Sequence, residues 1–356
     1  MRRARTRLPF RKGNGRMQRL LATMTATITL IACSVRESQS REPTADDVRS
    51  SIRKSLPLLE KGSIGSADNR TCFTCHSQAL PVFALTEAKR RGFDIDEENL
   101  ERQIKHAAAH LERGKARYVE GRGQGGGVDT AGYALWTLEA GGGEPDETTA
   151  VVTEYLLKKF QTKEKHWKRT GKRPPTEASE YTTTYLALRG LSVFGTPDQQ
   201  ERIAEQTTSV AAWLKDASPK ETEDRVFFLR ALEYTDVDSQ IAKTAVDELI
   251  QMQREDGGWA QKTDMKSDAY ATGTVLVALE RSGLVSPSDE VYRRGLRYLL
   301  KTQLDDGSWR VKTRSKPIQT YFETGFPHEK DQFISTFATG WATVALLLTL
   351  PEKAAP

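Results

Sequence analysis

Two loops of nearly the same sequence recur in the second half of the chain. Residues 253–259 read QREDGGW and residues 303–309 read QLDDGSW, so the two loops begin 50 residues apart. The glycine in each supplies a backbone conformation that residues with a Cβ avoid, and the tryptophan is expected to fold back over the preceding helix. A third copy, QTKEKHW at 161–167, has Lys165 in place of the glycine. The recurrence predicts a chain built from repeated helical units.

The segments around these loops alternate between two kinds of helix. From Asp46 to Leu350 the apolar residues follow helical spacing, with almost no strand-like alternation. Charged, amphipathic segments are expected to be outer helices, and segments rich in small and aromatic residues to be buried inner helices. The expected outer helices are 146–160, 198–215, 239–252 and 288–302, with 46–61 or 97–113 completing the set, and the expected inner helices are 75–92, 128–142, 181–195, 224–235, 270–283 and 335–350.

This alternation predicts an all-α fold, an α/α toroid of about six helical hairpins. Each hairpin exposes an apolar face that only a neighbouring hairpin can cover, and closing the ring leaves no exposed end. An open helical solenoid is the alternative.

The N-terminal segment is typical of an export signal. Residues 1–32 contain eight basic residues and no acidic residue, and end in an apolar run from Leu20 to Ala32 that is too short to span a bilayer. The LIAC sequence ending at Cys33 resembles a bacterial lipobox. We therefore expect a lipoprotein signal at 1–32, lipidation of Cys33, a flexible tether at 33–45 and a helical body at 46–350, anchored by lipid to the extracytoplasmic (periplasmic) face of a bacterial membrane. A plain secretory signal is the alternative, and translation starts at Met1 or Met17.

The positive net charge belongs to this leader. Without it, 45 basic residues remain against 48 acidic residues, so the charge predicts no nucleic-acid partner. The basic stretch from Lys163 to Arg173 offers a docking surface to an acidic partner, although a solvated charged loop explains it better, and His166 within it is expected to be exposed.

The segment CFTCH, from Cys72 to His76, predicts a covalently bound c-type haem. The two thiols, Cys72 and Cys75, would bond to the haem vinyl groups and His76 would ligate the iron from the proximal side. A zinc half-site, a redox dithiol and coincidence are the alternatives. Zinc usually takes four protein ligands, and the only other cysteine is Cys33.

The QxxxGxW motif is the repeat motif of the squalene cyclases and their relatives. On this motif the chain resembles the prenyltransferase and squalene-oxidase-repeat superfamily, whose members fold as α/α toroids. Residues 70–93 and 321–335 further resemble bacterial cyclase-repeat proteins that carry a CxxCH motif. The resemblance covers roughly residues 46 to 350 and implies a toroid with a central cavity.

The other site candidates are a distal iron ligand and a set of polar residues at helix starts. His328 is the preferred distal ligand, with an open or water-bound position as the alternative, and His106 and His110 lie one turn apart on a helix face that suits a metal or solvent. Inner helices that start at one rim would bring their first residues to the cavity. These rim candidates, which helix capping would also explain, are Asp129, Glu180, Tyr181, Asp224, Arg225, Asp268, Tyr270, Asp331 and Gln332.

Two activities suggested by the resemblance lack their motifs. Squalene and hopene cyclases use a DxDD acid, whereas the nearest strings here are DVDS at 236–239 and DIDE at 94–97. Protein prenyltransferases need a zinc site with a cysteine that this chain lacks. The main hypothesis is a redox protein that passes electrons to a partner protein or oxidises a ligand in the toroid cavity. An apolar-ligand or partner-binding toroid with structural or sensory haem, and a degenerate terpene cyclase, are the alternatives.

Overall fold

The computed structural model describes residues 42–317 and 320–353. The expected signal peptide 1–32, the lipid site Cys33 and most of the expected tether 33–45 lie outside these residues. The first helix begins at Ala45, next to the residue where the sequence predicts the folded body to begin, and the Thr44 side chain caps it. No helix among the described residues is both long enough and apolar enough to cross a bilayer.

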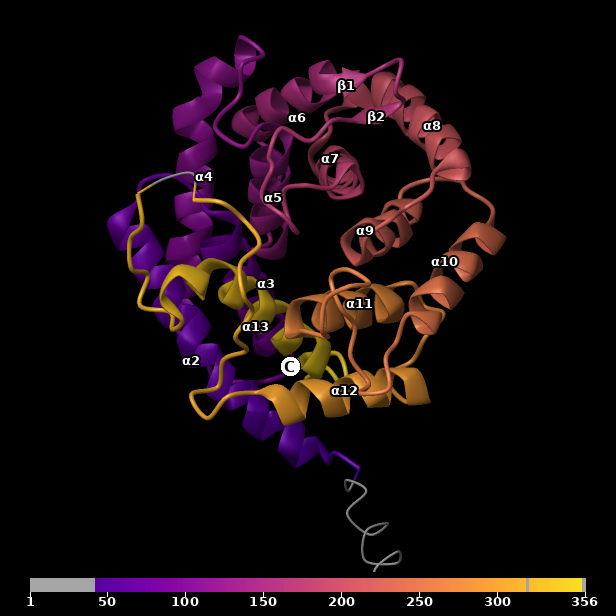
Figure 1. Ribbon diagram of the computed structural model, residues 1–356. Coiled ribbons are helices and arrows are strands. Elements are labelled where there is room, and N and C mark those ends of the chain that lie inside the picture. Colours follow the sequence, from indigo (N-terminus) through magenta and orange to yellow (C-terminus); the bar gives the residue numbers. More distant parts are fainter. Residues whose placement is uncertain (1–41, 318–319, 354–356) are drawn as a thin grey trace, which may run out of the picture. The chain divides into compact units, whose positions relative to one another are not determined.

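Twelve α-helices in the described residues form two concentric layers (Figure 1). The inner helices are α3 (Leu80–Arg90), α5 (Gly127–Ala140), α7 (Glu180–Phe194), α9 (Thr222–Leu232), α11 (Ala269–Arg281) and α13 (Gln332–Leu347). The outer helices are α2 (Ala45–Asn69), α4 (Glu97–Val119), α6 (Glu147–Lys159), α8 (Gln200–Asp216), α10 (Ser239–Gln251) and α12 (Glu290–Thr302).

The inner layer is a closed ring. Each inner helix packs against the next, and α13 returns to α3, so the toroid prediction is confirmed and the open solenoid is excluded. Burial follows the expected division of the helices. Every residue of α5 from Gly127 to Leu138 is buried, whereas α8 buries only Val210 and Leu214. The small residues of the inner helices let their backbones pack closely, and the outer helices keep one face in water.

The two QxxxGxW loops join consecutive hairpins. In the second loop, Trp309 Nε1 donates to Leu299 O at 2.9 Å, while Gln303 Nε2 donates to Gly307 O at 2.9 Å and to Ser51 O at 3.0 Å. The last contact ties the end of α12 to α2. This loop therefore connects the C-terminal part of the ring to its N-terminal part.

The first loop repeats this arrangement one hairpin earlier. Trp259 Nε1 donates to Leu249 O at 2.7 Å and Gln253 Nε2 donates to Val291 O at 2.8 Å. Gly257 and Gly307 have φ angles of 86° and 93°, in the left-handed region that the sequence predicts for them. Lys165 in the degenerate copy adopts the same region, with φ 65°.

The degenerate copy forms a short hairpin, and the expectation that His166 is exposed is wrong. Strands β1 (Phe160–Gln161) and β2 (His166–Trp167) pair antiparallel, which turns the His166 ring inward. The ring packs on Trp213 of α8 with centroids 4.4 Å apart and is buried. The many basic residues of this loop predict an exposed segment, so composition alone does not reveal the turn that buries His166.

Candidate functional site

The CxxCH turn leads directly into an inner helix. After an extended Thr74, residues Cys75–Ala79 form one π-helical turn, in which the Leu80 N–H donates to Cys75 O, and α3 follows. Pro81 lies in the first turn of α3, directly after this π-helical turn. Such wide turns occur often at functional sites. The Thr74 N–H donates to Gln78 Oε1 at 2.7 Å, which ties the start of the turn to its own helix.

Two histidines of α4 contact the same turn. The Phe73 N–H donates to His110 Nδ1 at 3.2 Å, and His106 Nε2 lies 3.4 Å from Cys72 O. The Phe73 and His110 rings lie 6.0 Å apart. The pair, which could from sequence alone have faced a metal or solvent, therefore positions the CxxCH backbone.

His76 lines a cavity of about 480 Å³ at the rim where the inner helices begin. The wall beside it comes from the first turns of α13, where Phe333, Ile334 and Phe337 also line the cavity. The His76 ring meets Phe333 edge to face at 4.6 Å between centroids and lies 6.1 Å from Phe337. Of the inner-helix starts expected at one rim, that of α13 lies beside the CxxCH motif at this cavity.

The outer edge of the cavity is cationic. Arg173, Lys312, Lys316 and Lys330 line it, together with the carboxylates of Glu177 and Asp331. Both carboxylates are engaged. Arg173 Nε donates to Glu177 Oε2 at 2.7 Å, and Asp331 accepts from Arg310 at 3.2 Å and from the Thr313 N–H at 3.0 Å. The three lysines have no carboxylate partner among the described residues, so the edge carries positive charge.

The His76 imidazole is held in its neutral form. Its side chain is buried, and its Nε2 atom has no hydrogen-bond partner in the described part of the chain. Burial, with a smaller contribution from Arg173, lowers the pKa of His76 to about 3. A neutral imidazole with a free ring nitrogen is the form that binds a metal.

The two thiols differ in accessibility. Cys72 is exposed, whereas Cys75 is buried, and burial raises the pKa of the Cys75 thiol well above its ordinary value. Neither cysteine is among the residues that line the His76 cavity.

The haem that the motif implies needs an axial nitrogen, an apolar seat and positive charge for its propionates. The buried, unpartnered Nε2 of His76 meets the need for an axial nitrogen, the phenylalanines meet the need for an apolar seat, and the cationic edge suits the propionates. His76 and the lining of its cavity therefore fit a haem, while the two thiols lie outside the lining, in the turn that precedes and includes His76. Within the described ranges, no group of three or more His, Cys, Asp or Glu side chains could hold a bare metal ion.

The three site candidates near the start of α13, which are His328, Asp331 and Gln332, take different positions in the structure. Asp331 lines the His76 cavity. His328 is not among the lining residues, and its Nε2 is paired with Ser308 Oγ at 2.7 Å, so the structure does not bring it to His76. Gln332 is buried, and its Oε1 accepts from the Thr324 N–H at 2.9 Å. It anchors the preceding loop, as a helix-start residue commonly does.

A second group lies inside the ring. Asp129 and Tyr270, both predicted from sequence, are buried, and Tyr270 Oη donates to Glu223 Oε2 at 2.8 Å. Asp129 Oδ1 accepts from Thr183 Oγ1 at 2.5 Å, while its Oδ2 has no partner among the described residues. Burial is the largest cause that raises the pKa of Asp129 and of Glu223 to about 7.

The other rim candidates take structural positions away from the His76 cavity. Asp268 caps α11 by accepting from the Ala271 N–H at 2.9 Å. The remaining four form contacts towards the outer layer and the loops: Tyr181 stacks on Trp213, Glu180 lies 3.8 Å from His166, Asp224 accepts from the Glu221 N–H and Arg225 pairs with Glu248. The capping explanation holds for Asp268, and for Asp224, whose side chain completes the capping box of α9.

Sequence reasoning missed several residues of the site. Glu223 is the buried carboxylate at the start of α9, whereas the sequence predicts the neighbouring Asp224. The helical phase of the apolar residues that follow distinguishes the two. Phe333 and Phe337 are spaced four apart, so they share one face of α13. Arg173, Lys312 and Lys316 lie in loops and Lys330 lies in the short 3-10 helix before α13, where no periodicity signals their position.

Comparisons with known proteins show which folds this chain is similar to. No protein-family model matches the chain. Over 118 residues it is 30% identical to lanosterol synthase erg7A of Aspergillus fumigatus, a match that spans 32% of this chain and 15% of the synthase. Thus the chain matches only a small part of that protein's length.

Among solved structures, the type II terpene cyclase MstE from Scytonema aligns with a TM-score of 0.53 at 14% identity, over 86% of this chain and 98% of the cyclase. A variant of MstE in complex with its product, merosterolic acid A, aligns with a TM-score of 0.54 at 13% identity, over 85% and 96% of the two chains. A protein from Actinoplanes aligns with a TM-score of 0.52 at 12% identity, over 85% and 99%. The described part of the chain therefore has the α/α toroid fold of the type II terpene cyclases.

Proposed function

We propose that this chain is a haem protein in which a terpene-cyclase-like toroid holds a c-type haem for electron transfer or for oxidation of a bound ligand. The observation that carries the proposal is His76. It directly follows Cys75 in a CxxCH motif, and its buried, unpartnered Nε2 belongs to a side chain that lines a cavity.

Each part of the site has a role in this proposal. Cys72 and Cys75 would form thioether bonds as each thiol adds across a haem vinyl group, and His76 would bind the iron. The bound haem would supply a one-electron couple. Phe333 and Phe337 exclude water from the imidazole, and the histidines of α4 hold the turn that carries the thiols. Arg173 disfavours protonation of His76, which keeps the ring available as a ligand.

The proposal includes the location and partners of the protein. Haem attachment of this kind suits an exported protein, and lipidation of Cys33 would tether it to the membrane, where it would meet a redox partner protein. A Cys33→Ser variant is expected to move from the membrane fraction to the soluble fraction. An unchanged membrane fraction would contradict the lipid anchor without affecting the haem proposal.

Covalent haem can be tested directly. The full chain is expressed together with a cytochrome c maturation system, and haem is detected on a denaturing gel and by absorption spectra of the oxidised and dithionite-reduced protein. Haem that survives denaturation is expected in the wild type and absent in the Cys72→Ala, Cys75→Ala double variant. A wild-type chain that folds without covalent haem would refute the proposal.

The iron ligand requires a separate comparison. His76→Ala is expected to keep the thioether bonds but to shift the haem absorption bands, because the proximal nitrogen is lost. His328→Ala provides the matched control, since His328 is paired with Ser308 and is not part of the cavity. Equal spectral shifts in both variants would contradict the assignment of His76.

A second function, proton-initiated chemistry on an apolar isoprenoid ligand, has support from the interior of the ring. Asp129 and Glu223 are buried carboxyl groups whose pKa is raised to about 7, so both retain a proton near neutral pH, as a general acid must. Incubation with squalene followed by mass spectrometry tests this function. Cyclised product that depends on Glu223 but not on Cys72 would favour the cyclase function over the haem function.

A further inference from the structure

A second cavity, of about 680 Å³, lies on the other side of the segment that walls the His76 cavity. It is lined by the glycine-rich loop before α5, the end of α6 and the loop from Lys168 to Arg173. Arg173 and Glu177 line both cavities, so their ion pair separates the two. Its volume is in the range of small-molecule sites, which is about 300 to 1,000 Å³.

The lining of this second cavity is strongly cationic. Six basic side chains face one carboxylate, Glu177, which Arg173 already pairs: Arg122, Lys159, Lys168, Arg169, Lys172 and Arg173. The chain beyond the leader has 45 basic and 48 acidic residues, so this concentration of charge is local. Like charges this close repel one another unless an anion binds between them.

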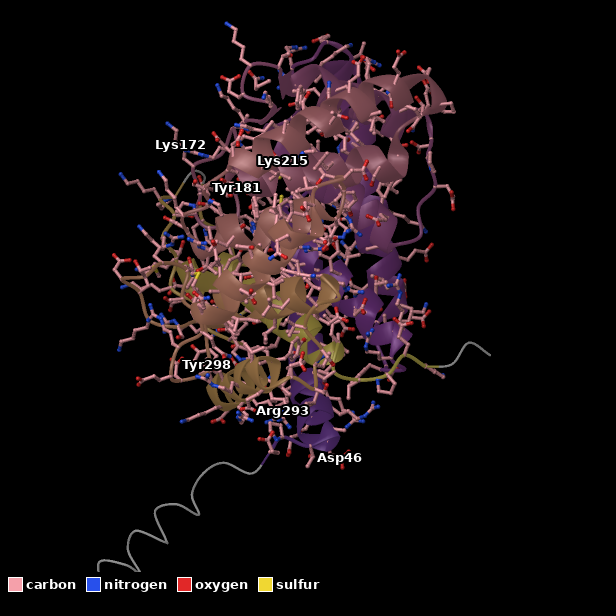
Figure 2. The ribbon with its side chains drawn as sticks, turned by 90° about the vertical axis from the view of Figure 1, so that its right-hand side faces the viewer. Asp46, Lys172, Tyr181, Lys215, Arg293 and Tyr298 are labelled. Carbon is pink, nitrogen blue, oxygen red and sulfur yellow. The ribbon has the colours of Figure 1, made fainter. Side chains whose placement is uncertain are left out.

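Three of the six cations are not paired with a carboxylate. In residues 42–317 and 320–353, Lys172 has no ion pair within 4 Å, Arg169 donates only to the backbone oxygen of Gly171, and Lys159 lies 5.5 Å from the centre of the Tyr155 ring. Lys172, which lines this cavity, projects outward on the left side of the molecule in Figure 2. The other three cations are paired: Arg122 with Glu120, Lys168 with Glu164 and Arg173 with Glu177.

The backbone adds hydrogen-bond donors to these charges. Gly126, the N-cap residue of α5, has no side chain to cap the helix, and Gly126, Gly127 and Val128 line the cavity. The Gly127 N–H donates to Gln124 O at 3.0 Å. The N–H groups that follow it in the first turn of α5 lack acceptors within the helix, and such groups attract anions. Thr170 Oγ1 donates to Gly126 O at 2.8 Å, which holds the cationic loop against this helix start.

We propose that this second cavity binds a small polyanion that carries phosphate groups, with Arg169 and Lys172 as its main side-chain ligands. A guanidinium group and an ammonium group beside backbone N–H donors match the geometry and charge of phosphate oxygens. The concave shape favours a small ligand over an acidic protein, which would bind a flatter surface. This inference does not depend on haem, because the ligand would occupy the cavity on the opposite side of Arg173 from His76.

Binding can be measured by isothermal titration calorimetry of the full chain with inorganic pyrophosphate, at an ionic strength of about 0.15 M, where unspecific charge effects are screened. Saturable binding of one pyrophosphate per chain is expected, with a Kd below about 1 mM. In the Arg169→Ala, Lys172→Ala double variant, the Kd is expected to rise by at least about tenfold, since charge-assisted hydrogen bonds are lost. Both side chains are exposed, so the variant should fold.

The matched control removes the same charge elsewhere. Lys243 on α10 and Lys301 on α12 are exposed and lie outside this cavity, so the Lys243→Ala, Lys301→Ala variant should keep the wild-type Kd. Equal weakening in both double variants would show unspecific attraction and overturn the proposal. The absence of saturable binding to pyrophosphate would do the same, as would binding of polyglutamate in its place.

The phosphate can come from a soluble molecule or from a lipid headgroup. Sedimentation with phosphatidylglycerol vesicles, compared with phosphatidylcholine vesicles, separates the two sources. Vesicle binding that requires Arg169 and Lys172, and that pyrophosphate displaces, would assign the phosphate to a lipid. Pyrophosphate binding without vesicle binding would assign it to a soluble ligand.

Discussion

Replacing Gly307 with alanine should destabilise the toroid at the point where its two ends meet. Gly307 lies in the second QxxxGxW loop, with φ 93°, against the first helix of the ring. A Cβ added there would lie 2.3 Å from the backbone oxygen of Lys54 in α2. Because the obstacle is backbone, it cannot move aside as the end of a flexible side chain would.

The expected cost has two parts. A left-handed conformation costs a residue with a Cβ about 1–2 kcal/mol, and forcing a methyl group into a packed site costs about 1–3 kcal/mol more. Gly283→Ala isolates the first part, since Gly283 has φ 70° and a Cβ there would meet nothing within 4 Å. The Gly307 variant should therefore lose about 2–5 kcal/mol of unfolding free energy, and the Gly283 variant about 1–2 kcal/mol.

Guanidinium unfolding of wild type and both variants, followed by far-UV circular dichroism, measures the difference. The Gly307→Ala midpoint should lie clearly below that of Gly283→Ala, and its slope should stay near the wild-type slope if the ring unfolds as one unit. A Gly307→Ala midpoint equal to or above that of Gly283→Ala would refute the inference that the loop packs directly on α2.

Three further changes test other parts of the structure. Lys165→Gly should raise the unfolding free energy by about 1 kcal/mol, because Lys165 is held at φ 65°; an unchanged or lower value in urea unfolding would refute the strain. Gln303→Ala should lower it by about 1–2 kcal/mol by removing the bonds to Gly307 O and Ser51 O, again by urea unfolding, and a neutral effect would show that the link is not needed. Asp129→Asn should reduce the pH dependence of stability. Burial raises the pKa of Asp129 to about 7, so the folded wild type holds a proton that the unfolded chain has lost, and its stability falls as pH rises from about 4 to about 7. Unfolding midpoints at pH of about 5 and about 8 should differ less in the variant; an equal difference would contradict the shift.

Much of the ring could be predicted from sequence because its signals are local. The spacing of apolar residues in 269–281 and 290–302 distinguishes a helix buried on all sides from one with a wet face, and Gly257 marks the end of a repeat. The sequence is less informative about which residues of a helix face the interior. At the start of α9 the sequence predicts Asp224 and Arg225 at the cavity, yet the buried carboxylate is Glu223, one position and about 100° of helix rotation before Asp224.

The sequence by itself determined the helical hairpins, the repeat loops and the position of the CxxCH motif at the start of an inner helix, since each depends on residues close in the chain. Only the tertiary structure decided which distant residues surround His76. It brought Phe333 and Arg173 to His76 and left His328 paired with Ser308. It also folded the basic loop against the glycine-rich start of α5, which forms the second cavity. Loops carry no periodicity, so their positions follow from long-range packing, and the charges they contribute to a site cannot be placed from local pattern.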